Sequence, residues 1–350
     1  MRTSRLIGAL AAAALALGLA ACAPAPTSTP TETPAEQPGG TTSAPATTDG
    51  FPVTIDHVYG QTVIEKKPER IATVAWANHE VPLALGVVPV GMAKVSWGDD
   101  DHDGVLPWVE DKLTELGAAT PVLFDETDGI NYEAVADTNP DVILASYSGL
   151  TREEYDTLSK IAPVVAYPEN AWGTSVEEMI TLNSTAIGLA DEGAKLIEDL
   201  HAQIAAALEA NSVLKGKKVL FAYVDPNDLS QIGFYTALDT RPGFLASIGL
   251  PLPAIVEQNA DSTDFYLTIS SEKADELNDV DLIVTYGDDD STIATLQADP
   301  LLSKIPAIAE GRVVILVNDT PLAASANPSP LSIPWGIDDY LALLAAPLAQ

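Results

Sequence analysis

The chain has 350 residues, with 17 Lys and Arg against 50 Asp and Glu, which gives a formal net charge of −33. This balance excludes a nucleic-acid partner, because proteins that bind phosphate backbones present clustered basic residues. Hydrophobic residues make up 47% of the sequence, enough to bury the core of one or two domains. The single cysteine excludes an intramolecular disulfide, a cysteine-rich zinc site and a Cys-x-x-Cys redox centre.

The first 22 residues have the pattern of a bacterial lipoprotein signal. Arg2 and Arg5 precede an apolar run, Leu6–Leu19, which is too short for a comfortable membrane span. The tetrapeptide Leu-Ala-Ala-Cys that ends at Cys22 resembles the lipobox, in which the cysteine becomes the lipidated first residue of the mature protein. We therefore expect a signal peptide over residues 1–21 and a lipid anchor on Cys22, at the extracellular face of the cell membrane. The alternative is an ordinary secretory signal with an incidental cysteine.

The residues after Cys22 have the composition of a tether. Residues 23 to about 50 are mainly Pro, Thr, Ser, Ala and Gly, so they bury too little apolar surface to offset the entropy of ordering. The segment 22–50 is therefore expected to be a flexible connection between the anchor and a folded body that begins at Phe51.

From Phe51 onward, short apolar runs rich in β-branched residues alternate with segments of helical periodicity. Such runs are typical of parallel strands that are buried on both faces. The predicted strands are Ile71–Trp76, Val87–Met92, Val142–Ser146, Val164–Tyr167, Val219–Val224, Leu282–Thr285 and Val313–Val317. A capping box that begins at Thr151 marks the start of one intervening helix. The predicted fold class is α/β.

The segment from Gly173 to Asn211 differs from the rest, because no proline interrupts it and its apolar residues recur at spacings of three, four and seven. This pattern predicts one helix of roughly 50 Å over residues 173–211. Such a helix could bridge an N-terminal lobe, 51–172, and a C-terminal lobe, 212–350. The alternative is a pair of helices broken at Gly188 or Gly193.

The two predicted lobes share a weak internal repeat. In each, a glutamate near a helix start, Glu133 or Glu272, precedes an aspartate that introduces an aliphatic strand, Asp141 or Asp281. The two glutamates and the two aspartates are separated by almost the same number of residues. Two similar units joined by a helix suggest a ligand cleft between them.

Four motifs in order then point to a known family. They are Glu69–Thr73, Ala84–Gly91, Asn131–Ala136 with Pro140–Leu144, and Pro330–Trp335. Together with the lipobox, the chain resembles the actinobacterial ferric-siderophore-binding lipoproteins, within the iron-siderophore and cobalamin substrate-binding family that serves ABC importers. The resemblance covers about residues 51–350. It implies two lobes with mainly parallel sheets joined by a rigid helix, and a ferric siderophore held between the lobes and delivered to a membrane permease.

A ferric siderophore arrives with its iron already wrapped in the ligand's own oxygen atoms, so no cofactor and no metal ligand is expected from the protein. The site needs aromatic surface and a few cationic or hydroxyl donors, near the carboxyl ends of the strands. The candidate ligand-binding residues are Trp76, Trp97, Tyr147, Trp172, Tyr223, Tyr235, Arg241, Tyr286 and Trp335. For each aromatic residue, core packing is the alternative; for Arg241 it is a solvated loop charge.

Glu133 and Glu272 receive a different assignment. Each follows a candidate N-cap, Asn131 or Ser270, by two residues and is therefore expected in the first exposed turn of a helix. In the family that the chain resembles, matching glutamates dock onto arginines of the membrane permease. The alternative for each is simple stabilisation of the helix dipole.

Two other functions remain open, a cobalamin- or haem-binding protein of the same transporter class and a surface-tethered hydrolase. The four histidines form no close pair with metal-ligand spacing, and the acidic run 99–103 is expected to be a solvated loop rather than a calcium site. No Gly-x-Ser-x-Gly nucleophile elbow occurs. We therefore expect a monomeric binding protein and not an enzyme. Its acidic body favours neutral or cationic ferric hydroxamates over anionic catecholates.

Overall fold

The structure is a computed structural model that describes residues 50–349, which lie in one compact unit, Thr47–Gln350. The predicted signal peptide, the lipidation site Cys22 and almost all of the predicted tether lie outside the described residues. Among the helices of residues 50–349, none is both long enough and apolar enough to cross a membrane.

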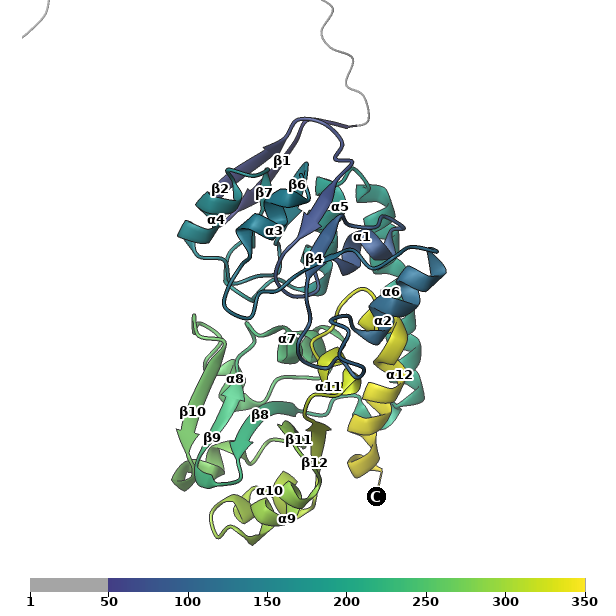
Figure 1. Ribbon diagram of the computed structural model, residues 1–350. Helices are drawn as coiled ribbons and strands as arrows, with labels where there is room; N and C mark the ends of the chain where they lie inside the picture. Colours follow the sequence, from purple (N-terminus) through teal and green to yellow (C-terminus); the bar gives the residue numbers. More distant parts are fainter. Residues whose placement is uncertain (1–49, 350) are drawn as a thin grey trace, which may run out of the picture. The chain divides into compact units, whose positions relative to one another are not determined.

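A five-stranded parallel sheet organises the N-terminal lobe (Figure 1). Its strand order is β5-β4-β3-β6-β7, and every pairing is parallel. The strands are β3 (Ile71–Thr73), β4 (Gly91–Ala93), β5 (Val122–Phe124), β6 (Val142–Leu144) and β7 (Val164–Val165), preceded by an antiparallel hairpin of β1 (Val53–His57) and β2 (Gly60–Ile64). The helices are α1 (Glu80–Ala84), α2 (Pro107–Glu115), α3 (Tyr132–Asp137) and α4 (Arg152–Leu158). The capping box predicted at Thr151 opens α4.

A second five-stranded sheet organises the C-terminal lobe, in the order β10-β9-β8-β11-β12. β8, β11 and β12 run parallel, whereas β9 and β10 are antiparallel. The strands are β8 (Val219–Asp225), β9 (Asp228–Tyr235), β10 (Tyr266–Ser270), β11 (Leu282–Gly287) and β12 (Val313–Val317). The α-helices are α7 (Thr240–Ser247), α8 (Ala254–Glu257), α9 (Ser291–Ala298), α10 (Pro306–Ala309), α11 (Pro321–Ser325) and α12 (Ser332–Ala345), and the 3-10 helices are η1 (Ser212–Leu214), η2 (Ser271–Leu277), η3 (Leu302–Lys304) and η4 (Ala346–Leu348). The predicted α/β class with two mainly parallel sheets is confirmed.

The prediction of one uninterrupted helix over 173–211 is wrong. The segment forms α5 (Val176–Ala186) and α6 (Ala190–Ala210), and the chain turns back between them at Gly188, whose φ is +70°. The two helices pack so closely that a Cβ on Gly193 would lie 2.1 Å from the Ser184 hydroxyl oxygen. The long helix of the fold is therefore α6, which spans about 30 Å.

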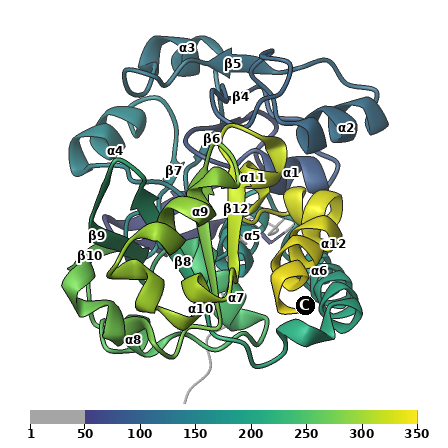
Figure 2. The same ribbon diagram turned by 90° about the horizontal axis from the view of Figure 1, so that it is seen from below.

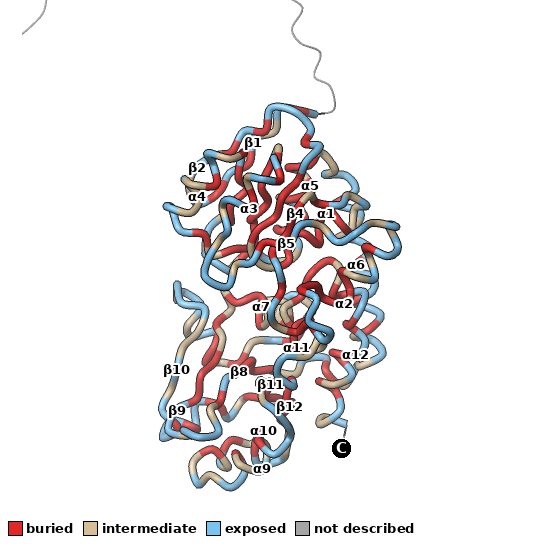
Figure 3. Tube along the Cα trace, viewed as in Figure 1, coloured by how far each residue is buried: buried red, intermediate tan, exposed pale blue. Residues whose placement is uncertain are grey.

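The lobes share one hydrophobic core beside α6. It contains Val81 and Tyr147 from the first lobe, Leu200 from α6, and Phe221 and Val284 from the second sheet. α12 returns along α6, as the views of Figures 1 and 2 agree. In Figure 3 the buried stretches follow the strands of both sheets, while most connecting loops are exposed.

The internal repeat has a structural basis. The Asp141 carboxylate accepts hydrogen bonds from the backbone N–H groups of Glu69 and Arg70, at 3.0 and 3.1 Å. The Asp281 carboxylate accepts one from the backbone N–H of Lys218 at 2.9 Å. Each aspartate thus fixes the start of its own strand against the neighbouring parallel strand, which explains why the same residue type precedes both.

Candidate functional site

Three tryptophans and a carboxylate gather at the carboxyl edge of the first sheet. Trp76 follows β3, Trp97 lies in the loop after β4, Glu126 follows β5, and Trp172 lies in the loop after β7. All four line a cavity of about 210 Å³. Trp76 and Trp97 are partly buried, whereas Trp172 is exposed over 38% of its surface and lies at the rim of the cavity. The sequence-based expectation that these three residues belong to the ligand site is consistent with this placement.

Across from this cavity, Arg241 in the first turn of α7 lies in an aromatic cluster. Its guanidinium carbon is 3.9 Å from the ring centroid of Tyr235, 5.3 Å from that of Phe221 and 5.7 Å from that of Tyr286. Such distances allow cation–π attraction, which strengthens as water is excluded. Tyr235 and Tyr286 were predicted as ligand-binding residues. We call Arg241, Tyr235, Phe221 and Tyr286 the arginine cluster.

The Arg241 guanidinium is already paired in this structure. Its Nε and Nη2 atoms donate hydrogen bonds to the two carboxylate oxygens of Asp239 at 2.8 and 2.7 Å. Burial lowers the pKa of Arg241, but the hydrogen bonds and charge of Asp239 outweigh burial and raise the pKa overall. Arg241 is therefore a permanent, oriented cation and not a solvated loop charge.

Direct contacts join the two halves of the site. The ring centroids of Trp97 and Tyr286 are 5.6 Å apart, in an edge-to-face arrangement. The Tyr147 hydroxyl lies 3.1 Å from the hydroxyl oxygen of Thr240, and the rings of Tyr147 and Trp172 are 5.4 Å apart. Tyr147 therefore connects the lobes. Because it is almost fully buried, it has little surface to offer a ligand.

Two titratable groups beside the tryptophans carry strongly perturbed pKa values. Burial raises the pKa of Glu126 to about 7, against the opposing effect of a hydrogen bond from the backbone N–H of Ala75. Burial lowers the pKa of His79 to about 4, so this ring is neutral at physiological pH. Neither residue was predicted as a site residue. Glu126 could have been found from its position after a strand, but β5 is short and only its last residue is fully buried.

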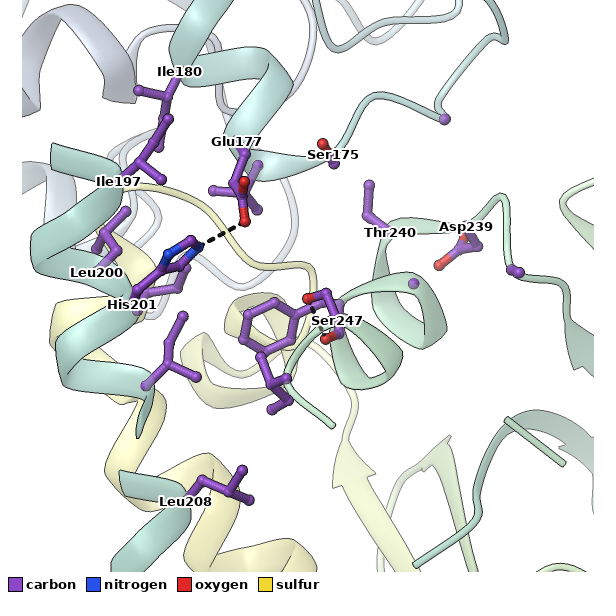
Figure 4. Close-up of a pocket in the computed structure, with 18 of the residues that line it drawn as sticks. Ser175, Glu177, Ile180, Ile197, Leu200, His201, Leu208, Asp239, Thr240 and Ser247 are labelled. Carbon is purple, nitrogen blue, oxygen red and sulfur yellow. Dashed lines mark hydrogen bonds and ion pairs between the residues drawn. The ribbon is translucent and has the colours of Figure 1, made fainter. Parts of the chain in front are cut away.

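A larger cavity of about 550 Å³ lies between α5, α6 and α7 (Figure 4). Its surface is mainly aliphatic, and the Glu177 carboxylate on α5 accepts a hydrogen bond of 2.7 Å from the His201 imidazole on α6. Asp239 and Thr240 lie at its edge. Phe244 is its single aromatic residue, and neither Arg241 nor any tryptophan lines it. Three of the tryptophans that were predicted as ligand residues, and Arg241, therefore lie at the smaller, tryptophan-lined cavity and the arginine cluster, and not at the larger cavity.

Two predicted ligand residues lie elsewhere. Tyr223 projects from β8 with 47% of its surface exposed, and it lines neither cavity. Trp335 lies on α12 and packs on Trp108, with ring centroids 5.1 Å apart, and it also lines neither cavity. Trp335 was expected in a loop, whereas it lies in the first turn of a helix. Neither residue belongs to the tryptophan-lined cavity or to the arginine cluster, and their role as ligand residues stays a prediction.

Glu133 and Glu272 have the local positions that were predicted. Glu133 is exposed in the first turn of α3, whose N-cap Asn131 accepts a hydrogen bond from the backbone N–H of Ala134. Glu272 is exposed in the first turn of η2, and its own backbone N–H donates to the Ser270 hydroxyl. The second element is a 3-10 helix and not an α-helix, which weakens the helix-dipole explanation for Glu272.

The loop between β4 and α2 holds carboxylates that could bind a metal ion. Within residues 50–349, Asp99, Asp101 and Asp103 form the only group with three potential ligand atoms within 4.8 Å of one another. Burial and the charge of Asp103 raise the pKa of nearby Glu110 to about 6. In the twelve-residue segment 99–110, the three aspartates stand at positions one, three and five, Gly104 at position six and Glu110 at position twelve. This is the spacing of an EF-hand calcium loop. The sequence-based interpretation as a merely solvated loop overlooked Gly104 and Glu110.

Comparison with known proteins identifies the family. A family model described as periplasmic binding protein matches residues 71–320. The chain belongs to this family. The crystal structure of PiaA from Streptococcus pneumoniae TIGR4 in complex with ferrichrome is 47% identical, covers 85% of this chain and 98% of PiaA, and superposes with a TM-score of 0.81. A periplasmic solute binding protein from Mycobacterium smegmatis is 26% identical over 85% of this chain and 98% of its own, with a TM-score of 0.67.

Two curated relatives are less similar to this chain than PiaA is. The Fe(3+) dicitrate-binding periplasmic protein FecB of Escherichia coli is 25% identical over 77% of this chain and 84% of FecB. The probable siderophore-binding lipoprotein YfiY of Bacillus subtilis is 32% identical, but the match spans only 43% of each chain. These relatives are substrate-binding proteins, which is consistent with the expectation of a non-enzyme.

Proposed function

We propose that this protein captures a ferric siderophore at the tryptophan-lined cavity and the arginine cluster, and delivers it unchanged to an ABC importer. The observation that carries the proposal is the position of Arg241, which Asp239 holds against the ring of Tyr235. The neighbouring Tyr286 contacts Trp97 of the other lobe, so the cation lies close to the tryptophans. Aromatic surface fits the organic shell of a siderophore, and a fixed guanidinium fits its chelating oxygens. The 47% identity to a protein crystallised with ferrichrome supports this choice.

The location and the partner belong to the same proposal. A lipid on Cys22 would hold the protein at the extracellular face of the membrane, with residues 23 to about 50 as the tether. Glu133 and Glu272 would contact the permease, one from each lobe. Their exposure in the first turns of α3 and η2 supports this role, because an exposed carboxylate is free to meet a basic partner surface.

A titration of tryptophan fluorescence tests the proposed ligand class. Trp76, Trp97 and Trp172 surround the proposed site, so a coloured iron complex bound there should quench a large part of the emission of the five tryptophans. The titrants are a ferric hydroxamate, a ferric catecholate, haem and cobalamin, and the expected result is saturable quenching by the hydroxamate. Saturation by haem or cobalamin alone would reject the proposal, and turnover of an ester or peptide panel would point to a hydrolase.

A further inference from the structure

The tryptophan-lined cavity contains a carboxylate whose hydrogen bonding is incomplete. Glu126 Oε2 accepts a hydrogen bond from the backbone N–H of Ala75 at 3.0 Å. Glu126 Oε1 is buried and has no hydrogen-bond partner among residues 50–349. No lysine, arginine or histidine of the described chain forms a salt bridge with Glu126. A buried carboxylate without a counter-charge is costly, so a site that retains one is suited to a ligand that supplies the missing charge.

The other groups around this cavity favour a cation. The faces of Trp76, Trp97 and Trp172 carry negative electrostatic potential and attract ammonium groups, more strongly where water is excluded. The ring of His79 is neutral and its buried Nδ1 has no partner among the described residues, so it does not repel a cation. Lys94 is the one permanent cation that lines the cavity, and its side chain is exposed.

We propose that this cavity binds a primary ammonium group of the siderophore, with Glu126 Oε1 as its counter-charge and the three indoles as its cage. The inference rests on the proposed function and narrows the substrate class to ferric siderophores that carry a free alkylammonium. The volume of about 210 Å³ is sufficient for an ammonium with a few methylene groups but not for a whole iron complex. The iron-bound oxygens then lie toward the arginine cluster, because Trp97 contacts Tyr286 and Tyr286 contacts Arg241.

Two iron complexes with the same chelating groups test the proposal. Ferrioxamine B is a linear ferric trihydroxamate with one free ammonium, and its N-acetyl derivative keeps the chelate but lacks that charge. We expect the purified protein to bind ferrioxamine B at least tenfold more tightly than the acetylated form, by fluorescence and by calorimetry. Glu126→Gln should reduce this ratio to within twofold.

Asp125→Asn is the matched control. It removes the same unit of charge one residue away, at an exposed side chain that does not line the cavity. It should preserve the tenfold preference. Calorimetry at pH 6.5 in buffers of different ionisation enthalpy measures the number of protons released on binding. A purely structural role of Glu126 would not make this number differ between the two iron complexes. Ferrioxamine B should release part of a proton from Glu126 on binding, and the acetylated form should release none.

The possible results distinguish failure of the proposed ammonium site from failure of siderophore binding itself. Equal affinity of wild type for both complexes would overturn the ammonium site while leaving siderophore binding intact, and this comparison needs no variant to fold. Preservation of the preference in Glu126→Gln, or its loss in Asp125→Asn, would also overturn it. Failure of both complexes to bind would reject ferric hydroxamate capture itself, and the ammonium site with it.

Discussion

Glu80 is a fully buried carboxylate that joins the lobes, and its ionisation should make stability depend on pH. The carboxylate on α1 accepts hydrogen bonds from Trp108 Nε1 at 2.9 Å, from the backbone N–H of Leu331 at 3.1 Å and from the Ser329 hydroxyl. Burial nevertheless raises its pKa from 4.5 to about 7, since the cost of burying the charge exceeds what these bonds return. The difference corresponds to about 3 kcal/mol in the free energy of unfolding.

The raised pKa of Glu80 in the folded protein determines whether stability rises or falls with pH. Because the folded pKa is raised, the contribution of Glu80 to stability is complete below pH 4.5 and is lost as the pH rises toward 7. Glu80→Gln cannot ionise, and its amide replaces one acceptor by a donor, at a pH-independent cost of about 1–3 kcal/mol. The variant should therefore be less stable than wild type at pH 5. Between pH 5 and pH 8 the difference should shift by about 2.5 kcal/mol in favour of the variant, which closes or reverses the gap.

Urea unfolding at pH values from 5 to 8 measures this gap. The difference between the two proteins is the relevant quantity, because other buried groups titrate in both. His79 has a lowered pKa, so its contribution is present above pH 6.5 and is lost as the pH falls through about 4. Glu69→Gln, at an exposed position, is the control and should give a gap near zero at every pH. A Glu80→Gln gap that stays constant with pH would refute the reasoning.

Four further predictions concern the ligand, the loop, the permease and the anchor. Arg241→Lys loses the planar contact with Tyr235 and should weaken ferric hydroxamate binding about tenfold in a fluorescence titration without changing the circular dichroism spectrum. Calcium at millimolar concentration should stabilise the protein by about 1–2 kcal/mol in thermal melts. A chelator should reverse this stabilisation and Glu110→Gln should abolish it, whereas a melting temperature that calcium does not change would reject the calcium loop. Replacing Glu133 and Glu272 together by Ala should abolish uptake of labelled iron with an unchanged Kd for the siderophore, so normal uptake would exclude the docking role. Cys22→Ser should move the protein from the membrane pellet to the medium, and its retention in the pellet would contradict the lipid anchor.

The sequence predicted the strands that are buried on both faces and missed the more exposed ones, for a physical reason. β3, β6, β8, β11 and β12 are buried on both faces and therefore read as continuous apolar runs. β9 is buried only near its end, β10 has no buried residue, and the two strands pair antiparallel, so no long apolar run marks them. The break in the long helical segment was hidden as well. α5 and α6 present their apolar residues to the same core, so the helical periodicity continues across Gly188.

The candidate site was predicted in part, because residue type and strand ends can be recognised locally while partners cannot. Trp76, Trp97 and Trp172 follow strands and reach one cavity. Trp335 satisfied the same residue-type criterion, but it lies on a helix whose position depends on the folded C-terminal lobe. Asp239, the partner of Arg241, lies only two residues before it in the sequence, and this acid-x-arginine pattern could have revealed that the arginine is held in place.

The shared core of the two lobes has a consequence for the kinetics of capture. Tyr147 packs in the cluster that contains Leu200 and Phe221, and its hydroxyl contacts Thr240, so contacts within the protein itself join the two walls of the site. The ligand then meets a preassembled surface, and its affinity carries no penalty for populating a rare closed state. Association should accordingly be a single step whose rate rises linearly with ligand concentration, and differences in affinity among siderophores should arise mainly from how slowly each one leaves.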